Sequence, residues 1–149
     1  MDVIFDVDGT LLNIEHRVPL IRPTNGSKKD WAAFRAQAIN DVPNIEIIEV
    51  ARAMSLAKHR LIICTGRMEK ERGITLATLL AYDFPFCGVP IYMRPNEDTR
   101  PDHVIKLDML VKLRADGFDP KLVFDDRQQV VDMWRSVGLR VCQVAPGNF

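Results

Sequence analysis

Short apolar runs alternate along the chain with longer segments in which apolar residues recur at helical spacing. Each run is rich in valine and isoleucine and is bounded by residues that favour turns, which is typical of strands buried on both faces of a parallel sheet. The five runs are Val3–Phe5, Leu61–Cys64, Val89–Met93, Leu122–Phe124 and Arg140–Val144. Strands that alternate with helices predict a doubly wound α/β domain, with a mainly parallel five-stranded sheet flanked by helices.

The segments between these runs predict the helices. Three of them have an apolar face, formed by Ile47, Ala51 and Met54, by Val104, Leu107 and Val111, and by Val130, Trp134 and Val137. We expect Trp134 to lie in the core. Gly117 and Gly138 stand where two of these helices should end, because glycine commonly follows the last helical residue. Met68–Tyr82 predicts a further helix with a weaker apolar pattern.

One long segment, residues 13–44, interrupts this alternation between the first strand and its helix. It is far longer than the roughly 2–6 residues usual for such a connection, and it contains three prolines and one glycine. A short helix is predicted across Asp30–Ile39. Long insertions at this place act as lids or specificity elements, or are exposed elaborations without a role. We interpret it as a small cap within a single domain that spans residues 1–149.

Composition describes an ordinary globular protein of 149 residues, with 47% hydrophobic residues and equal numbers of basic and acidic side chains, 20 of each. A net charge of zero argues against non-specific binding of the whole chain to nucleic acid or membranes. Cys64, Cys87 and Cys142 are widely spaced in apolar runs, which predicts buried thiols in a reducing compartment. Neither a secretory signal nor an apolar stretch of roughly 18 residues occurs. We therefore expect a cytoplasmic protein.

Two carboxylates, Asp6 and Asp8, directly follow the first run and precede Gly9. Residues i and i+2 of a strand point the same way, so both acids can face one small volume. Two carboxylates this close together need a bound cation, a shared proton or two different chemical roles. Phosphoryl transfer through an aspartyl intermediate supplies all three.

Further polar residues follow the first four predicted strands. In open α/β sheets, ligands bind at the carboxyl ends of the strands. These polar residues are Thr10 after the first strand, Thr65, Gly66 and Arg67 after the second, Arg94, Arg100, Asp102 and Lys106 after the third, and Asp125, Asp126 and Arg127 after the fourth. Carboxylates, a hydroxyl, a lysine and arginines at one edge are suited to a hard cation and a phosphoryl group.

This ordered set resembles the four motifs of the haloacid dehalogenase superfamily of phosphatases. The motifs are Asp6-Val7-Asp8-Gly9-Thr10, Thr65, Lys106 and Asp125-Asp126. Further segments resemble the phosphatase half of bifunctional phage polynucleotide kinase–phosphatases, which remove 3′-phosphates from nucleic-acid ends. They are Thr65–Arg67, Thr99–Asp102, Asp125–Gln128, Val130–Arg135 and Gln143–Phe149. The sequence has no Gly-rich loop ending in Gly-Lys-Ser/Thr, and its insertion is longer than the cap of those enzymes.

The resemblance implies a role for each catalytic residue. Asp6 is expected to attack phosphorus and Asp8 to protonate the leaving hydroxyl, then to activate the water that hydrolyses the aspartyl-phosphate. Thr65 is expected to donate to a phosphoryl oxygen, and Lys106 to offset negative charge in the transition state. Mg²⁺ is the implied ion. Its expected ligands are Asp6, the main-chain carbonyl of Asp8, and one of Asp125 and Asp126, while the other binds through water or orients Lys106.

The resemblance further implies a substrate-binding set that consists of Thr10, Arg17, Gly66, Arg67, Arg94, Arg100 and Asp102. Arginines hold phosphates bidentately, so a neutral chain can still carry a local basic cluster. Two of them, Arg94 and Arg100, could instead pair with Glu97, Asp98 or Asp102. Arg127 is interpreted as an ion-pair partner of its neighbouring acids.

Trp31 and Phe34 lie three residues apart on the predicted helix of the insertion. They could stack on a base at the entrance of the site, but this spacing favours packing of the cap onto the body.

Together these features predict a Mg²⁺-dependent phosphomonoesterase that removes the 3′-phosphate from DNA or RNA ends. One alternative is a nucleotide or deoxynucleotide monophosphatase with the same chemistry. Another is a non-catalytic subunit that binds phosphorylated ends. A separate kinase or ligase would be a natural partner, because no kinase motif is present.

Overall fold

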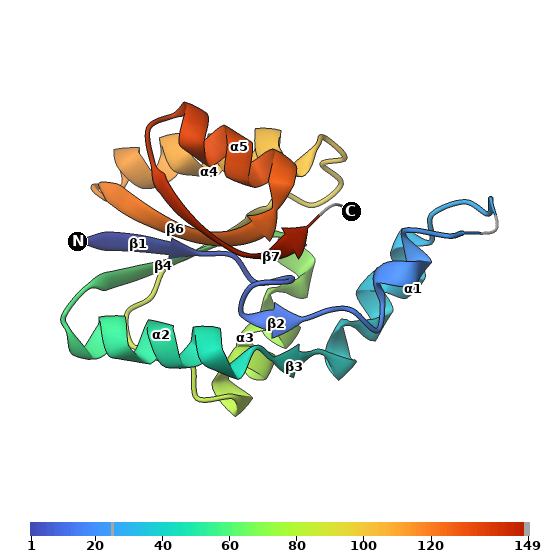
Figure 1. Cartoon of the computed structure of the whole chain (residues 1–149), viewed down its shortest axis with the longest axis horizontal. Helices are drawn as coiled ribbons and strands as arrows, with labels where there is room; N and C mark the ends of the chain where they lie inside the picture. Colours follow the sequence, from blue (N-terminus) through green and yellow to red (C-terminus); the bar gives the residue numbers. More distant parts are fainter. Residues whose placement is uncertain (25, 148–149) are drawn as a thin grey trace.

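A parallel five-stranded sheet forms the centre of the molecule (Figure 1). The computed structural model describes residues 1–24 and 26–147. The strands are β1 (Asp2–Phe5), β4 (Arg60–Met68), β5 (Ile91–Arg94), β6 (Pro120–Arg127) and β7 (Arg140–Gly147). Their order is β5-β4-β1-β6-β7, and every pairing between them is parallel. The predicted α/β class and sheet are confirmed.

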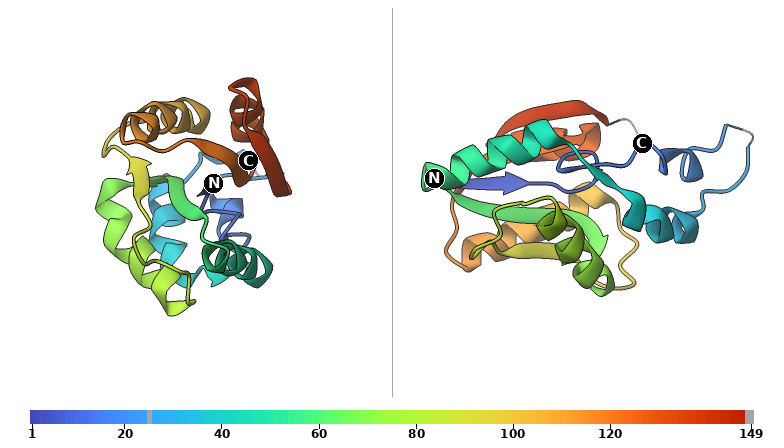
Figure 2. Two further views of the ribbon diagram at one scale, coloured as in Figure 1. Left: turned by 90° about the vertical axis from the view of Figure 1, so that its left-hand side faces the viewer. Right: turned by 90° about the horizontal axis from the view of Figure 1, so that it is seen from below.

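Helices cover both faces of this sheet. They are α2 (Ile45–Leu56), α3 (Arg72–Ala81), α4 (Asp102–Ala115) and α5 (Gln128–Ser136). Figures 1 and 2 show α2 and α3 on one face and α4 and α5 on the other. Side chains of β1 alternate between these layers: Val3 and Phe5 pack with the α2 side, and Ile4 packs with the α4 side. All three are fully buried, as expected for a central strand.

The faces of α2 and α5 are as the periodicity predicts, with Ala51, Val130 and Trp134 fully buried. Gly117 and Gly138 have φ values of +91° and +86° just past α4 and α5, so both helices end as expected.

The predicted face of α4 is wrong. Leu107 and Val111 are exposed, whereas Ile105, Met109 and Leu113 are buried against the sheet. Apolar residues surround much of this helix, so periodicity alone selects no unique face. The observed rotation brings the neighbouring residue Lys106 to the end of the sheet.

Several predicted boundaries also differ. Strand β4 continues to Met68, and a 3₁₀ turn, η3 (Glu69–Glu71), precedes α3, so the helix begins at Arg72 instead of Met68. The Glu71 carboxylate accepts a hydrogen bond from the Met68 amide at 2.8 Å and fixes this turn. Strand β5 begins at Ile91 instead of Val89, since Pro90 has no amide to donate to a ladder.

The segment between β1 and α2 forms an arm, defined here as residues 14–41. Its stem is an antiparallel pair, β2 (Leu12–Asn13) with β3 (Val42–Pro43). The arm contains two 3₁₀ turns, η1 (Val18–Leu20) and η2 (Gln37–Asn40), and one helix, α1 (Trp31–Ala36). A small core of Ile14, Ile21 and Phe34 holds it together. Figures 1 and 2 show the arm extending beyond the carboxyl ends of the strands.

The cysteine prediction is corrected in part. Cys64 is buried in β4, but Cys87 and Cys142 are exposed, and all three are free thiols. Cys142 is exposed because β7 is an edge strand, and Cys87 lies in the loop before β5. The last two residues of the Gln143–Phe149 motif, Asn148 and Phe149, lie outside the described residues. In the described chain, no helix has the length and apolar character needed to cross a membrane.

Candidate active site

Three carboxylates meet at the carboxyl ends of β1 and β6. Oxygen atoms of Asp6, Asp125 and Asp126 lie within 4.8 Å of one another, and all three residues are buried. Burial and the two neighbouring acids raise the pKa of Asp6 well above its ordinary value, although Lys106 opposes this effect. Carboxylates that are this close together and buried away from water need a cation to compensate their negative charge.

Lys106 supplies part of that compensation. Its Nζ donates to Asp6 Oδ1 at 2.7 Å and to Asp125 Oδ2 at 2.9 Å, and its side chain is 1% exposed. Burial alone would lower the pKa of Lys106, but the surrounding carboxylates raise it well above its ordinary value. The ammonium is therefore permanently charged and fixes the position of Asp6.

The two adjacent acids of β6 have different surroundings. Asp125 Oδ2 accepts from Lys106 and also from the indole Nε1 of Trp134 at 3.1 Å. Asp126 Oδ1 is buried and has no hydrogen-bond partner among the described residues. Burial and the neighbouring Asp125 raise the pKa of Asp126 to about 7. Asp125 thus already accepts hydrogen bonds from protein donors, whereas Asp126 has a buried oxygen that is available to a cation or a ligand.

Asp6 and Asp8 face the same cavity, but not for the reason that strand alternation gives. Strand β1 ends at Phe5, and the chain then turns through Gly9, whose φ is +84°. A Cβ at Gly9 would collide with the Asp126 carboxylate, so only glycine fits this turn without displacing that acid. The turn separates the partners of the two carboxylates, since Asp6 bonds to Lys106 and Asp8 bonds to arginines.

Two buried arginines hold Asp8. Arg17 Nη2 lies 2.7 Å and Arg67 Nη2 lies 2.6 Å from Asp8 Oδ1. Burial alone would raise the pKa of Asp8, but the two guanidinium groups lower it below its ordinary value. Both arginines are less than 5% exposed, so their charge is directed into the site.

Asp41 completes this cluster, although no local pattern in the sequence predicts it. Its Oδ2 lies 2.7 Å from Arg17 Nη2 and 2.6 Å from Arg67 Nη2, and Arg17 Nε donates to Oδ1 at 2.8 Å. The Asp41 side chain is fully buried at the end of the arm. We call the four residues Asp8, Arg17, Asp41 and Arg67 the arginine clamp.

A second group of polar residues surrounds Gly66. Arg94 Nε donates to the Gly66 carbonyl at 2.9 Å, and Arg94 Nη2 lies 3.1 Å from Asp102 Oδ1. A Cβ at Gly66 would collide with the Asp102 carboxylate, so glycine permits this close approach. Arg127 Nη1 lies 3.7 Å from Asp102 Oδ2, an acid of α4, and its expected pairing with the neighbouring acids of its own motif stays a prediction.

Arg100 is half-exposed and pairs with Asp98 and Asp108. Pairing with Asp98 was one of the alternatives open for this residue.

A cavity of about 490 Å³ connects these groups. Its lining includes the predicted residues Asp6, Asp8, Arg17, Gly66, Arg67, Arg94, Arg100, Asp102 and Asp126. Four other predicted residues, Thr10, Thr65, Lys106 and Asp125, are buried outside this lining. Thr65 Oγ1 accepts from the Arg67 amide at 3.2 Å, and Thr10 Oγ1 has no partner in the described chain. The roles of all these residues stay predictions.

The aromatic pair of the arm is divided between two environments. Phe34 is 7% exposed and packs on Ile14 and Ile21 inside the arm, whereas Trp31 is 41% exposed. Both side chains contribute to the wall of the cavity. The expectation that both pack the cap onto the body is wrong for Trp31, because the short helix α1 leaves its first residue beyond the small core of the arm.

The donor set fits a hard divalent cation. Carboxylate oxygens are the ligands that Mg²⁺ prefers, and the buried oxygen of Asp126 that has no partner in the described chain is available beside Asp6. With one lysine for three acids, the cluster retains negative charge that such an ion would neutralise.

The fold is shared with known hydrolases. A haloacid dehalogenase-like hydrolase from Streptococcus pneumoniae matches 94% of this chain and 82% of its own, with a TM-score of 0.58 at 13% identity. This likeness shows the fold alone, and the match of the whole chain to a phosphatase family model is what identifies it as a phosphatase of the haloacid dehalogenase superfamily. Residues 1–149 match the family described as the polynucleotide kinase PNKP phosphatase domain, and the chain belongs to that family.

More similar chains occur in larger proteins. A chain of the Pnkp1/Rnl/Hen1 complex matches 99% of this chain with a TM-score of 0.81 at 29% identity, over 46% of its own length. A second structure of that RNA repair complex gives a TM-score of 0.80 at 29% identity, over 99% of this chain and 43% of the other. A protein of Autographa californica nuclear polyhedrosis virus, named "Putative bifunctional polynucleotide kinase/RNA ligase", is 26% identical over 136 residues.

That match covers 91% of this chain and 18% of the viral protein. The chain thus spans less than half the length of these relatives.

Proposed function

We propose that this protein is a Mg²⁺-dependent phosphomonoesterase that removes the terminal 3′-phosphate from DNA or RNA through an aspartyl-phosphate intermediate. The observation that carries this proposal is the arrangement of Asp6 and Asp8 on one cavity, where a buried lysine holds the first and two buried arginines hold the second. Binding alone would need neither a positioned nucleophile nor an acid.

In the first half-reaction, Asp6 attacks phosphorus and the bond to the 3′-oxygen breaks. Because Arg17 and Arg67 lower the pKa of Asp8, its carboxylate takes up a proton from the phosphate monoester as the phosphate draws the two guanidinium groups to itself, and it then gives this proton to the leaving hydroxyl. Lys106, 2.7 Å from Asp6, keeps the attacking carboxylate oriented and offsets the charge that develops on the phosphoryl oxygens. Asp8 then takes a proton from water, which attacks the phosphorylated Asp6 and releases inorganic phosphate.

The arginine clamp is suited to bind the phosphate that reacts. Arg17 and Arg67 reach the Asp8 carboxylate, so a phosphoryl oxygen placed beside Asp8 lies within range of the same guanidinium groups. Arg94, held by Asp102, adds positive charge to the lining of the cavity. The resemblance adds Thr65, Gly66, Thr10 and Arg100 to this binding set, of which Gly66 and Arg100 line the cavity and the two threonines are buried outside its lining.

For the cation, we assign Asp6, the main-chain carbonyl of Asp8, and Asp126 as ligands. Asp125 is better suited to orient Lys106, since that lysine and Trp134 already occupy its Oδ2. When bound, Mg²⁺ neutralises phosphoryl oxygens and polarises the phosphorus centre.

The polynucleotide substrate is supported by the family of the chain and by its relatives, whose names include a polynucleotide kinase, an RNA ligase and an RNA repair complex. We infer that the phosphatase works beside a kinase that phosphorylates the partner ends or a ligase that seals the ends it prepares. Within a larger assembly, the arm would act as the cap of this site, as its position beyond the strands favours.

A mononucleotide phosphatase is the second candidate. A cavity of about 490 Å³ is large enough for one nucleotide, and ligand pockets of this size commonly enclose small molecules.

Phosphate release from 3′- and 5′-phosphorylated DNA, RNA and mononucleotides, with and without Mg²⁺, tests the proposal. We expect release from 3′-phosphorylated oligonucleotides only with Mg²⁺, and a loss of at least about 1,000-fold in Asp6→Asn, because the nucleophile is removed. Asp119→Asn, which changes an exposed carboxylate at the other end of the sheet, is the matched control.

Equal or faster turnover of the 3′-mononucleotide would favour the second candidate. Binding of phosphorylated ends without turnover, unchanged in Asp6→Asn, would instead indicate a non-catalytic subunit.

A further inference from the structure

The cavity has a second wall that the phosphatase chemistry does not use. Ile21, Trp31, Phe34 and Arg35, all from the arm, line this cavity together with the acids and arginines. Trp31 is the more exposed of the two tryptophans at 41%, whereas Trp134 is fully buried. A half-exposed indole in the lining of a charged cavity leaves a large apolar surface available to a ligand in that cavity.

The indole is held in place from within the arm. Asp30 accepts a hydrogen bond from the Ala33 amide at 2.9 Å and fixes the start of α1, so Trp31 and Arg35 fall on one face of this helix. The Phe34 ring meets Trp31 edge to face at 5.7 Å, and Phe34 is anchored in the core of the arm. Trp31 is therefore a pre-positioned aromatic platform.

The outer part of the arm is basic. Residues 22–36 contain four basic side chains, Arg22, Lys28, Lys29 and Arg35, against the single acid Asp30, in a chain whose total charge is zero. None of the four basic groups forms an ion pair within residues 1–24 and 26–147. The ammonium of Lys29 lies 5.7 Å from the centre of the Trp31 ring.

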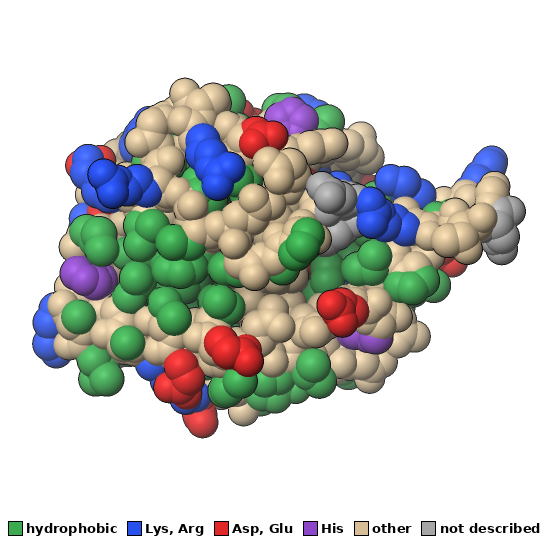
Figure 3. All heavy atoms as spheres, viewed as in Figure 1, with side chains coloured by type: hydrophobic (Ala, Val, Ile, Leu, Met, Phe, Trp, Pro, Cys, Tyr) green, Lys and Arg blue, Asp and Glu red, His purple; other side chains and the backbone are tan. Residues whose placement is uncertain are grey.

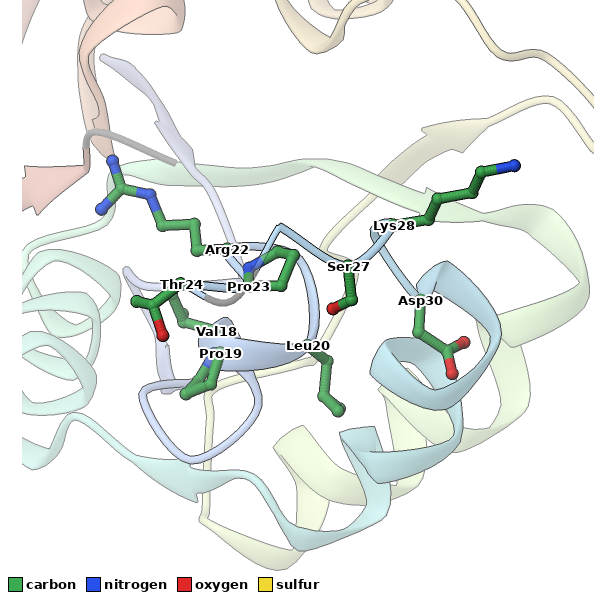
Figure 4. A pocket seen from close by; sticks show the side chains of 9 residues that line it. All are labelled: Val18, Pro19, Leu20, Arg22, Pro23, Thr24, Ser27, Lys28 and Asp30. Atoms are coloured by element: carbon green, nitrogen blue, oxygen red, sulfur yellow. The ribbon is translucent and has the colours of Figure 1, made fainter.

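These cations lie along the arm: Arg35 lines the active-site cavity, and Arg22 and Lys28 line a second hollow. Figure 3 shows basic side chains on the protruding arm. Figure 4 shows Arg22 and Lys28 directed outward from a hollow of about 640 Å³, whose walls include Val18, Pro19 and Leu20. An aromatic platform interleaved with cations is the combination that binds single-stranded nucleic acid, since bases stack and phosphates follow the positive charges.

We propose that the arm binds the single strand that precedes the terminal phosphate, with a base stacked on Trp31 and backbone phosphates beside Arg22, Lys28, Lys29 and Arg35. This site rests on the proposed function and extends it, because it makes the polymer, and not the terminal nucleotide alone, the preferred substrate. A mononucleotide has no backbone phosphate to place beside the outer lysines.

Binding and turnover are measured separately on the full chain. The ligand for binding is an oligonucleotide of about 12 residues with a 3′-hydroxyl, which needs no phosphatase activity. We expect it to quench the fluorescence of Trp31 and to lose this quenching in Trp31→Phe, while Trp31→Phe retains more affinity than Trp31→Ala. In Lys28→Ala/Lys29→Ala, the slope of log K against log salt should fall by about 1.4, the value for two single-strand phosphate contacts.

In turnover, the ratio of kcat/KM for the 3′-phosphorylated oligonucleotide to that for the 3′-mononucleotide should fall about tenfold in Lys28→Ala/Lys29→Ala. Arg114→Ala/Arg135→Ala removes two exposed arginines near the ends of α4 and α5, and it should leave this ratio unchanged.

An unchanged salt slope and an unchanged ratio in the lysine variant would overturn the proposal. Absence of 3′-phosphate release by the wild type, with intact oligonucleotide binding, would overturn the proposed function and leave the binding site standing.

Discussion

Asp41 of the arm and Arg67 of β4 are joined by an ion pair of 2.6 Å between Asp41 Oδ2 and Arg67 Nη2. The same oxygen lies 2.7 Å from Arg17 Nη2, so one carboxylate of the arm holds two arginines against Asp8. The arm and the carboxyl end of the sheet are therefore one electrostatic unit. Because Asp41 touches neither Asp6 nor Asp126 in the described contacts, we assign it as a positioning residue.

Asp41→Asn should raise KM for a phosphorylated substrate by about tenfold while kcat changes by less than about threefold, because both arginines lose their anchor. Removal of one partner from such a buried pair also lowers the free energy of unfolding, by up to about 3–5 kcal/mol. Steady-state kinetics, with circular dichroism to measure the folded fraction, test this expectation. An unchanged KM in a folded variant would contradict the positioning role; Asp119→Asn is the control.

Asp126→Asn should abolish the stabilisation that Mg²⁺ gives to the wild type. In chelator, the pKa of Asp126 is raised to about 7, chiefly by burial, so above about pH 4 the native state binds more protons than the unfolded state. This group therefore makes the metal-free protein less stable as pH rises from about 4 to about 7.

An uncharged asparagine removes this effect. At about pH 7.5 in chelator, the melting temperature of Asp126→Asn should exceed that of the wild type by at least about 2 °C. Differential scanning fluorimetry with and without Mg²⁺ measures both effects. An Mg²⁺ response equal to that of the wild type would show that Asp126 is not a ligand.

Trp134→Phe should reduce kcat by about 3- to 10-fold without a comparable change in KM. The variant removes the indole N–H that lies 3.1 Å from Asp125 Oδ2, and Asp125 in turn holds Lys106. A lost donor to a buried carboxylate also costs about 1–3 kcal/mol of unfolding free energy. Denaturant unfolding and kinetics on the same preparation separate the two effects. If Trp134→Phe is destabilised but keeps the kcat of the wild type, Trp134 contributes to packing only.

Asp2→Asn tests the end of the sheet that lies away from the site. Burial raises the pKa of Asp2, but the hydrogen bonds from Arg60 and the Asp119 amide outweigh it and leave the pKa below its ordinary value. The carboxylate therefore stabilises the fold above about pH 4, and this stability is lost as the pH falls through the lowered pKa.

At about pH 7 the variant should lose about 1–3 kcal/mol of unfolding free energy, with kcat unchanged. The difference from the wild type should shrink at about pH 3, as urea unfolding at several pH values would show. A difference that is constant with pH would contradict the ion-pair assignment.

Local periodicity was sufficient for the architecture. The five apolar runs and the glycines at the helix ends depend on neighbouring residues only, and their alternation with helices predicts a doubly wound sheet. The order of the strands, β5-β4-β1-β6-β7, is known from the structure. Periodicity was insufficient for α4, where Val104, Leu107 and Val111 form an apolar row as regular as the buried row of Ile105, Met109 and Leu113. The contact of Lys106 with Asp6, 100 residues away in sequence, selects between them.

The candidate site divides in the same way. Asp6, Asp8, Lys106, Asp125 and Asp126 follow predicted strands or begin the next helix, so their motifs alone indicate a shared edge. Asp41 had no such signal, because it lies 24 and 26 residues from its two arginines and only the return of the arm brings it there. The exposure of Trp31 was equally hidden, since spacing does not reveal how small the core of the arm is.

Strand patterning and motif chemistry are local properties, so the order of amino acids was enough to determine the doubly wound sheet and the acids that end two of its strands. Tertiary contacts alone decided how the two acids of β6 differ, which arginines hold Asp8, and which aromatic side chain stays uncovered. Those features depend on burial and on distances between residues far apart in the chain. At the contact distances found in the folded site, the desolvation and Coulomb energies change steeply with each ångström.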